Sequence, residues 1–231
     1  MMKGLEAVVF DLDGVLADTA MAHANSWVEV AKSAGIELTL PQADAFRGIP
    51  RVVALERIIG GNKQISRQMK LALLEMKGEL YRKEISRMGP ATLVDGAPEL
   101  LEGLRSIGIP LAVASASKHA ELVLEMTGVR HLFLAVSDGY FNGGQKPDPG
   151  QLLSLAYEIG LKRESTVVVE DSMAGLLAAK RAGMAGLAVG HAAAGCETAI
   201  AAIDSLAGYR AREFVELISA SMSCKLAGRV S

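Results

Sequence analysis

The sequence predicts an α/β protein in which a parallel sheet is covered by helices and interrupted by a helical insertion. Short apolar, often β-branched runs alternate with longer helical patterns, and several runs are apolar at successive positions, as in strands buried on both faces. A glycine closes each of four helical segments, where helices commonly end. The segment from about Asp18 to Arg87 contains helical patterns and no convincing strand.

The elements follow in chain order. Strands are expected at Leu5–Phe10, Pro110–Ala114, Leu132–Val136, Thr166–Val169 and Ala185–Val189. Helices are expected at Pro98–Ile107, His119–Thr127, Gln151–Ile159 and Ala174–Ala182, with the longest inserted helix at Ser66–Ile85. The Ala- and Gly-rich residues 191–202 are expected to form a loop running into a helix. We therefore predict an α/β core at residues 1–17 and 89–231 and a helical domain at residues 18–88.

Composition limits the class of protein. Half of the 231 residues are hydrophobic, which is enough for a substantial core, and the net charge of −2 with both signs interspersed provides no basic stripe for nucleic acid. Cys196 and Cys224 form neither a CxxC pair nor a disulfide framework, which fits a reducing compartment. The N-terminal apolar run is too short for a signal peptide, and no run approaches a membrane span. We expect a soluble, monomeric, cytoplasmic protein that binds small molecules.

Polar residues follow the predicted strands at the points where they end. In an open parallel sheet these ends meet at one edge, where ligands bind. The residues concerned, with one lysine that precedes a helix, are Asp11, Asp13, Ser115, Ser117, Lys146, Glu170 and Asp171.

This set of residue types is suited to phosphoryl transfer. Four neighbouring carboxylates repel one another, and a hard divalent cation with oxygen ligands would neutralise them; we predict Mg²⁺. Ser115, just before a helix, and Lys146 could bind a phosphate, and a carboxylate in line with the phosphorus is a competent nucleophile. Taken singly, the same residues also fit purely structural roles: an Asp-Gly turn for Asp11 and Asp13, and helix capping for Ser115 and Ser117.

Four motifs in matching order resemble those of the haloacid dehalogenase superfamily: FDLDG with Thr19, the strand-end Ser115, Lys146 before Pro-Asp-Pro, and Glu170-Asp171. The resemblance covers nearly the whole chain and implies a Rossmann-like core with an inserted helical cap that sets specificity. It also implies that Asp11 becomes an aspartyl phosphate and that Asp13 acts as general acid and base. Thr19, Ser115 and Lys146 would complete the catalytic set. The implied ligands of Mg²⁺ are Asp11, Asp13, Glu170 and Asp171.

Further residues resemble the β-phosphoglucomutases within that superfamily: HANSW, RGIPR, Lys77 with Tyr81, and SASK. This likeness implies interconversion of β-D-glucose 1-phosphate and glucose 6-phosphate through a 1,6-bisphosphate, with His23 coupling the cap position to protonation of Asp13. The implied substrate contacts are Trp27, Arg47, Gly48, Arg51, Lys77, Ser115, Ala116, Ser117 and Lys118. Ordinary packing or solvated charge is the competing interpretation for the cap residues.

Three departures from the mutase pattern stand out. Arg47 replaces a lysine, which keeps the charge but changes how a phosphate is bound. Asp95 replaces a proline, and His119 replaces an asparagine.

Other functions remain open on this sequence. A sugar-phosphate phosphatase would use the same residues, with water admitted to the aspartyl phosphate. A signalling receiver also has an acidic pair, a hydroxyl and a lysine on a parallel sheet, but it has no use for Asp13 as an acid or for an insertion of this length. A phosphonate hydrolase of the superfamily is disfavoured by the acid at position 13.

Overall fold

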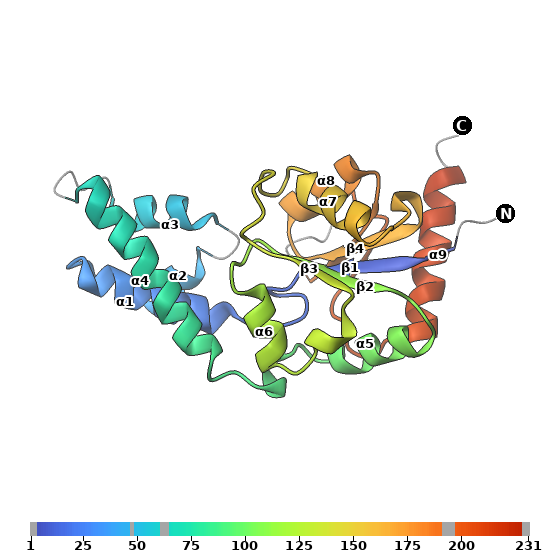
Figure 1. Cartoon of the computed structure of the whole chain (residues 1–231), viewed down its shortest axis with the longest axis horizontal. Coiled ribbons are helices and arrows are strands. Elements are labelled where there is room, and N and C mark those ends of the chain that lie inside the picture. Colours follow the sequence, from blue (N-terminus) through green and yellow to red (C-terminus); the bar gives the residue numbers. More distant parts are fainter. Residues whose placement is uncertain (1–3, 47–48, 61–64, 191–196, 228–231) are drawn as a thin grey trace. The chain divides into compact units, whose positions relative to one another are not determined.

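The computed structural model describes residues 4–46, 49–60, 65–190 and 197–227. The chain divides into two compact units, Met1–Ala17 with Gly89–Ser231 and Asp18–Met88, which we call the core unit and the helical unit. The core unit contains the labelled strands of Figure 1, and the helical unit contains α1 to α4.

The core unit is a parallel sheet with helices on both faces, which confirms the predicted fold class. Its strand order is β3-β2-β1-β4-β5-β6, with each neighbouring pair parallel. The strands are β1 (Ala7–Phe10), β2 (Leu111–Ala114), β3 (Ala135–Ser137), β4 (Thr166–Glu170), β5 (Ala185–Val189) and β6 (Ala201–Ile203). The helices are α5 (Ala97–Ser106), α6 (Ala120–Met126), α7 (Gly150–Glu158), α8 (Met173–Ala182) and α9 (Ala211–Ala227), with 3-10 turns at Pro90–Thr92, Arg130–Leu132 and Arg163–Ser165.

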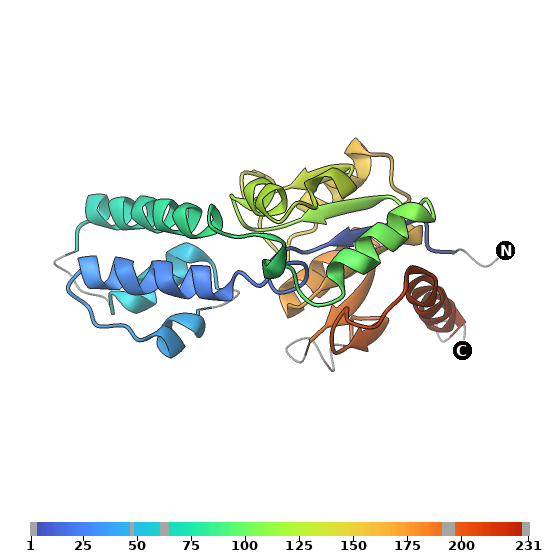
Figure 2. The ribbon, with the colours of Figure 1, turned by 90° about the horizontal axis from the view of Figure 1, so that it is seen from below.

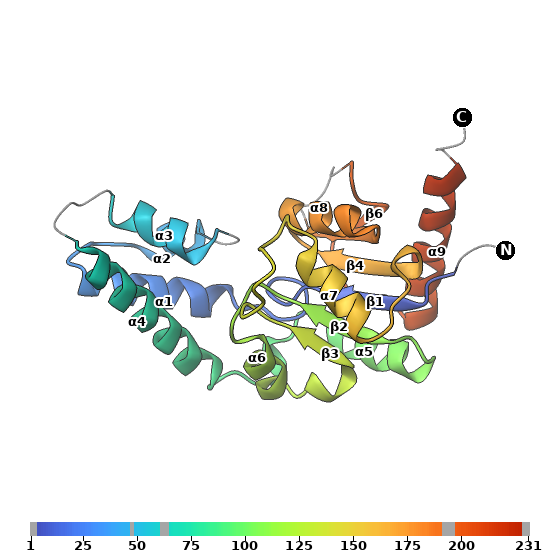
Figure 3. The same ribbon diagram turned by 45° about the horizontal axis from the view of Figure 1, so that its top comes forward.

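The apolar strands bury both faces of the sheet. Every residue of β1 is buried, because successive side chains point to opposite faces and helices cover both. Val9 packs with residues of α7 and α8, which lie in front of the sheet in Figure 3. Helix α5 contacts β2 and α9, and Figure 2 shows α5 and α9 from that side. Strand β1 pairs with β2 and β4 and so places the FDLDG motif at the middle of the sheet.

Two predicted elements differ from the structure. The strand expected at Leu132–Val136 begins only at Ala135, because a 3-10 turn precedes it and the Arg130 guanidinium donates to the Phe133 carbonyl at 3.0 Å. Residues 191–202 were expected to form a loop running into a helix, but β6 begins at Ala201 and pairs with β5. The following helix, α9, starts at Ala211.

The helical unit has its own apolar core. Its helices are α1 (Ala20–Ser33), α2 (Leu40–Asp44), α3 (Arg51–Ile58) and α4 (Arg67–Ile85). Ser66 caps α4 by accepting the Met69 backbone N–H at 3.2 Å, which explains where this long helix begins. Trp27 of α1 packs with Leu55 of α3 and Leu73 of α4 in one buried cluster. Within the described part of the chain, no helix is both long and apolar enough to cross a bilayer.

Candidate active site

The carboxyl ends of three strands bring the predicted polar residues of the core unit together. Asp11 directly follows β1, Ser115 follows β2, and Glu170 is the last residue of β4. One oxygen from each of Asp11, Glu170 and Asp171 lies within 4.8 Å of the others. These residues are far apart in the sequence, and the parallel order β2-β1-β4 is what places them side by side.

Lys146 is the cation of this cluster. Its Nζ donates to Asp11 Oδ1 at 2.6 Å, to Glu170 Oε1 at 2.5 Å and to the Ala114 carbonyl at 2.9 Å. An ammonium has three N–H donors, so all of them have a protein acceptor here. The Lys146 side chain is only 11% exposed, and it links the ends of β1, β2 and β4.

The second oxygen of Glu170 is bonded as well. Its Oε2 accepts the Ser172 backbone N–H at 3.0 Å and the Ser172 hydroxyl at 2.8 Å. The Ser172 hydroxyl oxygen in turn accepts the Gly175 N–H at 3.1 Å and caps α8. Glu170 is therefore fixed from two sides, by Lys146 and by the first turn of α8.

Burial and charge oppose each other at Asp11. Burial raises the pKa of the Asp11 carboxyl well above its usual value; Lys146 lowers it, whereas Glu170 and Asp13 raise it further. Burial also disfavours the charged form of Lys146, but Asp11 and Glu170 outweigh this and raise its pKa above the ordinary lysine value. Lys146 therefore stays protonated, whereas the Asp11 carboxyl is protonated more readily than an exposed aspartate.

The donor set of this cluster fits a hard divalent cation. Asp11, Glu170 and Asp171 supply three carboxylates, which carry three negative charges when ionised, and Lys146 supplies a single positive charge. The excess of about two negative charges matches a divalent ion, and carboxylate oxygens are the ligands that such ions prefer. Because the cluster is partly buried, the repulsion between its ionised carboxylates is poorly screened by salt.

Gly14, the last residue of FDLDG, has a backbone that other residues rarely adopt. Its φ is +82°, and a Cβ at this position would lie 2.4 Å from Asp171 Oδ2. The turn is closed by Gly14 N–H donating to the Ala17 carbonyl at 2.9 Å, and Asp13 pairs with Ala17 in a short bridge. The glycine thus allows Asp171 to approach the turn that carries Asp13.

The loop after β2 has a regular pattern of hydroxyl contacts. Buried Ser115 accepts the Ser117 N–H on its hydroxyl oxygen at 3.0 Å, and Ser117 accepts the His119 N–H in the same way at 3.3 Å. Ala116 is exposed, and Lys118 is half-buried with its Nζ 4.7 Å from the ring centroid of Tyr140. Two side-chain hydrogen bonds therefore hold the backbone of this loop, which presents one lysine beside an aromatic ring.

The helical unit contains a second group of predicted residues. Lys77 Nζ lies 2.8 Å from His23 Nδ1, and it sits 4.3 Å from the Tyr81 ring centroid and 5.6 Å from that of Trp27. Lys77 is 6% exposed, and the His23 and Tyr81 rings are stacked at 4.1 Å. A lysine ammonium can only donate, so a charged Lys77 requires Nδ1 of His23 to accept in this contact.

The remaining predicted residues of the helical unit lie elsewhere in it. Thr19 is buried at the start of α1, and its carbonyl accepts the His23 N–H. Arg51 is exposed at the first position of α3. Arg47 and Gly48 lie outside the described residues.

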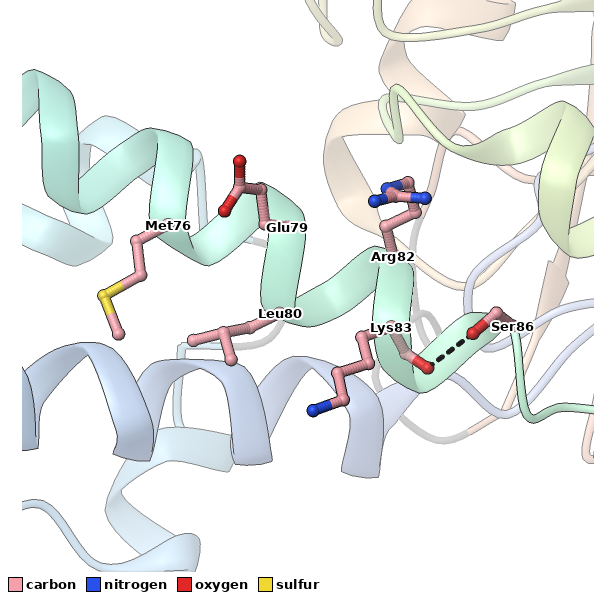
Figure 4. A pocket seen from close by; sticks show the side chains of 6 residues that line it. All are labelled: Met76, Glu79, Leu80, Arg82, Lys83 and Ser86. Carbon is pink, nitrogen blue, oxygen red and sulfur yellow. Dashed lines mark hydrogen bonds between the residues drawn. The ribbon is translucent and has the colours of Figure 1, made fainter.

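A hollow of about 550 Å³ on α4 contains none of the predicted residues. Figure 4 shows the side chains that line it, among them Met76 and Arg82, and the hydrogen bond from the Ser86 hydroxyl to the Lys83 carbonyl. All of its lining residues come from the last turns of one helix and the residue that follows it. It therefore offers no arrangement for phosphate chemistry.

The structure also adds residues that sequence reasoning missed. Gln151 is 6% exposed and contacts three backbone carbonyls at the ends of β2 and β3. Ser172 binds Glu170, and its position before a predicted helix was the available signal. Tyr140 and Gly175 gave no such signal, because their contacts depend on residues distant in sequence.

Gly175→Ala is expected to destabilise the protein by about 1–3 kcal/mol, as overpacking in a core does. A Cβ at this position would lie 1.8 Å from Glu170 Oε1, and Glu170 is fixed by Lys146 and Ser172. The measurement is urea unfolding. Gly78→Ala is the matched control, since it lies in a helix with no heavy atom within 4 Å of the added methyl. The control should stabilise by up to about 1 kcal/mol; equal effects of the two changes would contradict the packing argument.

Comparison with known proteins places this site in a family. A family model described as haloacid dehalogenase-like hydrolase matches residues 5–183. The β-phosphoglucomutase of Bacillus subtilis is 32% identical over 190 residues, 81% of this chain and 84% of that protein. The fructose-1-phosphate phosphatase of Escherichia coli is 31% identical over 187 residues, 80% and 96% of the two chains. The crystal structure of a β-phosphoglucomutase from Clostridium difficile matches with a TM-score of 0.82 and 28% identity, over 96% of this chain and 99% of that one. The chain therefore belongs to the haloacid dehalogenase superfamily and, within it, is similar to β-phosphoglucomutase.

Proposed function

We propose that this protein is a phosphosugar mutase that interconverts β-D-glucose 1-phosphate and glucose 6-phosphate through a 1,6-bisphosphate. The observation that carries the proposal is the setting of Asp11, which directly follows the central strand β1 and lies beside Lys146, Glu170 and Asp171. The similarity to a β-phosphoglucomutase over 81% of the chain supports the choice of substrate.

Asp11 is the proposed nucleophile. Lys146 binds Oδ1, so Oδ2 is the oxygen that attacks phosphorus. A bond forms between Oδ2 and phosphorus while the bond from phosphorus to the sugar oxygen breaks, and Asp13 gives its proton to that oxygen. In the return step a hydroxyl of the sugar attacks the aspartyl phosphate, Asp13 takes the proton, and Asp11 is regenerated.

Two lysines of the core unit have different proposed tasks. Lys146 orients Asp11 and contributes positive charge where the transferring phosphoryl group is negative. Ser115 and Ser117 shape the loop whose residues, with exposed Ala116 and half-buried Lys118, contact the substrate. Lys118 would bind the phosphate that is not being transferred.

Mg²⁺ is the proposed cofactor. Its ligands would come from Asp11, Asp13, Glu170 and Asp171, and when bound it would supply positive charge that offsets repulsion between the nucleophile and the phosphate. The excess negative charge of the carboxylate cluster supports this assignment.

The helical unit is the proposed cap over the substrate. Thr19 lies at its first hinge, and His23 would link the position of the cap to the proton on Asp13. Lys77 is buried and contacts His23, which supports a functional role for both residues, because burial of an ammonium costs free energy that a solvated surface lysine does not lose. The further proposed substrate contacts of this unit are Trp27, Arg47, Gly48, Arg51 and Lys77.

A sugar-phosphate phosphatase is the second candidate. The similarity to an E. coli fructose-1-phosphate phosphatase, at nearly the same identity as to the mutase, favours it specifically. The two functions share every step up to the aspartyl phosphate and differ in whether water or a sugar hydroxyl attacks it. Exclusion of water decides between them, by a difference of only a few kcal/mol in barrier, about a hundredfold in rate.

One assay separates the candidates. The protein is mixed with Mg²⁺, β-glucose 1-phosphate and a trace of the 1,6-bisphosphate, and glucose 6-phosphate and free phosphate are followed in the same tube. Glucose 6-phosphate without phosphate release is the expected result. Phosphate release alone would replace the mutase by the phosphatase, and formation of neither product would contradict the proposed substrate. A parallel tube with EDTA should be inactive and should recover when excess Mg²⁺ is added.

A further inference from the structure

The segment that follows β3 packs closely against the loop that follows β2. Gly139 N–H donates to the Ser117 carbonyl at 3.0 Å. A Cβ at Gly139 would lie 2.3 Å from the Ala116 carbonyl oxygen and 2.8 Å from the Lys118 nitrogen, so only a glycine fits between the two loops. The position of residues 138–140 is therefore set by the loop that carries Lys118.

The Gln151 side chain contacts the backbone of both loops. Its side-chain nitrogen lies 2.8 Å from the Ser115 carbonyl, 3.0 Å from the Ser137 carbonyl and 3.2 Å from the Asp138 carbonyl. An amide nitrogen has two hydrogens, which are shared here among three acceptors. Gln151 is 6% exposed, so these carbonyls at the ends of β2 and β3 are paired inside the protein rather than by water.

Tyr140 directly follows Gly139 in the second of these loops. Its backbone N–H donates to Asp138 Oδ1 at 2.9 Å, which orients the turn. Its ring is directly beside Lys118, with Nζ 4.7 Å from the ring centroid, within the range of a cation–π interaction. Tyr140 is 62% exposed, so much of its ring faces solvent next to Lys118.

Lys118 and Lys146 of the core unit differ in how their charge is balanced. Lys146 is bound by two carboxylates. Lys118 has no ion pair among the residues that the structure describes, and its neighbour is the neutral face of Tyr140. An aromatic face restrains an ammonium without cancelling its charge, so Lys118 keeps a full positive charge for an anion.

We propose that Tyr140 is a positioning residue that holds Lys118 for a second anionic group of the substrate, a phosphate on the far side of a doubly phosphorylated sugar. This inference rests on the proposed function, because it assumes that one phosphate reacts at Asp11 and the other is bound elsewhere. Tyr140 then contributes to specificity for compounds with two phosphates over compounds with one. Gln151 and Gly139 fix the backbone on which this pair depends.

The test compares two substrates in two variants. Tyr140→Leu should raise KM and Kd for glucose 1,6-bisphosphate by about two- to fivefold, the effect of losing an exposed cation–π contact. It should leave kcat and KM for p-nitrophenyl phosphate, which has one phosphate, unchanged. Tyr140→Phe should behave as the wild type, because the phenylalanine ring also attracts a cation. Tyr157→Leu is the matched control, since Tyr157 is 93% exposed in α7.

A double variant identifies the residue through which Tyr140 acts. In a Lys118→Met background, Tyr140→Leu should cause no further loss of affinity for the bisphosphate. An equal effect on both substrates, or an undiminished effect in the Lys118→Met background, would overturn the inference. If the wild type turned over neither compound, the proposed function would fail, and the Kd from titration calorimetry would still decide the role of Tyr140: an unchanged Kd, or no binding of the bisphosphate, overturns it.

Discussion

Asp11→Asn is expected to abolish turnover, by about a thousandfold or more, while the protein stays folded. An amide lacks the nucleophilic oxygen that attacks phosphorus, and no other described residue stands in the same relation to Lys146 and Glu170. The fold should survive because Lys146 keeps Glu170 and the Ala114 carbonyl as partners. Burial raises the pKa of Asp11, so its charged form contributes little to stability that could be lost.

Three measurements check this expectation. Initial rates give the loss of turnover, and intact mass after brief exposure to the bisphosphate shows whether a phosphoryl group is transferred to the protein. Thermal unfolding by circular dichroism gives the stability. Asp204→Asn, an exposed residue of the core unit, makes the same chemical change away from the site and should retain full activity. A variant at Asp11 with a near-normal rate, or one that is still phosphorylated, would end the nucleophile assignment.

The sequence could predict the centre of the sheet because its physical cause is local. Strands β1, β2, β4 and β5 are apolar at successive positions, since helices cover both faces of the sheet, and such runs are visible without any structure. The polar residues that end these strands then had to meet at one edge. The cluster of Asp11, Glu170 and Asp171 follows from that topology alone.

Elements without a local signature could not be predicted in the same way. Strand β6 is only three residues long, two of them alanine, and it exists because it pairs with β5 at the edge of the sheet. The start of β3 is delayed by a contact of Arg130 with a backbone carbonyl, which no hydrophobic pattern records. Short edge strands depend on their neighbours more than on their own sequence.

The partners of the charged residues could not be predicted from the sequence either. The sequence predicted Lys146 beside a phosphate, and it gave no sign that the three donors of this lysine are directed to Asp11, Glu170 and the Ala114 carbonyl. Asp11 lies 135 positions away in the chain, so this pairing depends wholly on the sheet order. The contact between Tyr140 and Lys118 could not be predicted either, because it joins the loops that follow two different strands.

Lys146→Met is expected to destabilise the protein by about 3–5 kcal/mol and to abolish turnover. The substitution keeps the length of the side chain but leaves Asp11 and Glu170, 12% and 1% exposed, facing each other without a cation. A buried charge that loses its partner costs far more than the pair contributes. Lys162→Met is the matched control: its ion pair with Glu6 is exposed, 65% and 50%, and its loss should cost less than about 1 kcal/mol.

The cause of the stability loss in Lys146→Met can be tested by measuring how that loss depends on pH and on Mg²⁺. Lys146 is what lowers the pKa of Asp11, so its removal raises that pKa further. When an acid has a higher pKa in the folded than in the unfolded state, the folded protein binds more protons. The free energy of unfolding of the protein is then greatest at low pH and falls as the pH rises through the folded pKa. The deficit in urea unfolding should therefore shrink as the pH falls below neutral and Asp11 becomes protonated. Added Mg²⁺ should also shrink it, because loss of the Lys146 cation leaves a more negative cluster, which binds the ion more tightly than the wild-type cluster and is stabilised more by it. A deficit that neither low pH nor Mg²⁺ reduces would mean that lost packing, rather than unbalanced carboxylates, is what Lys146 prevents.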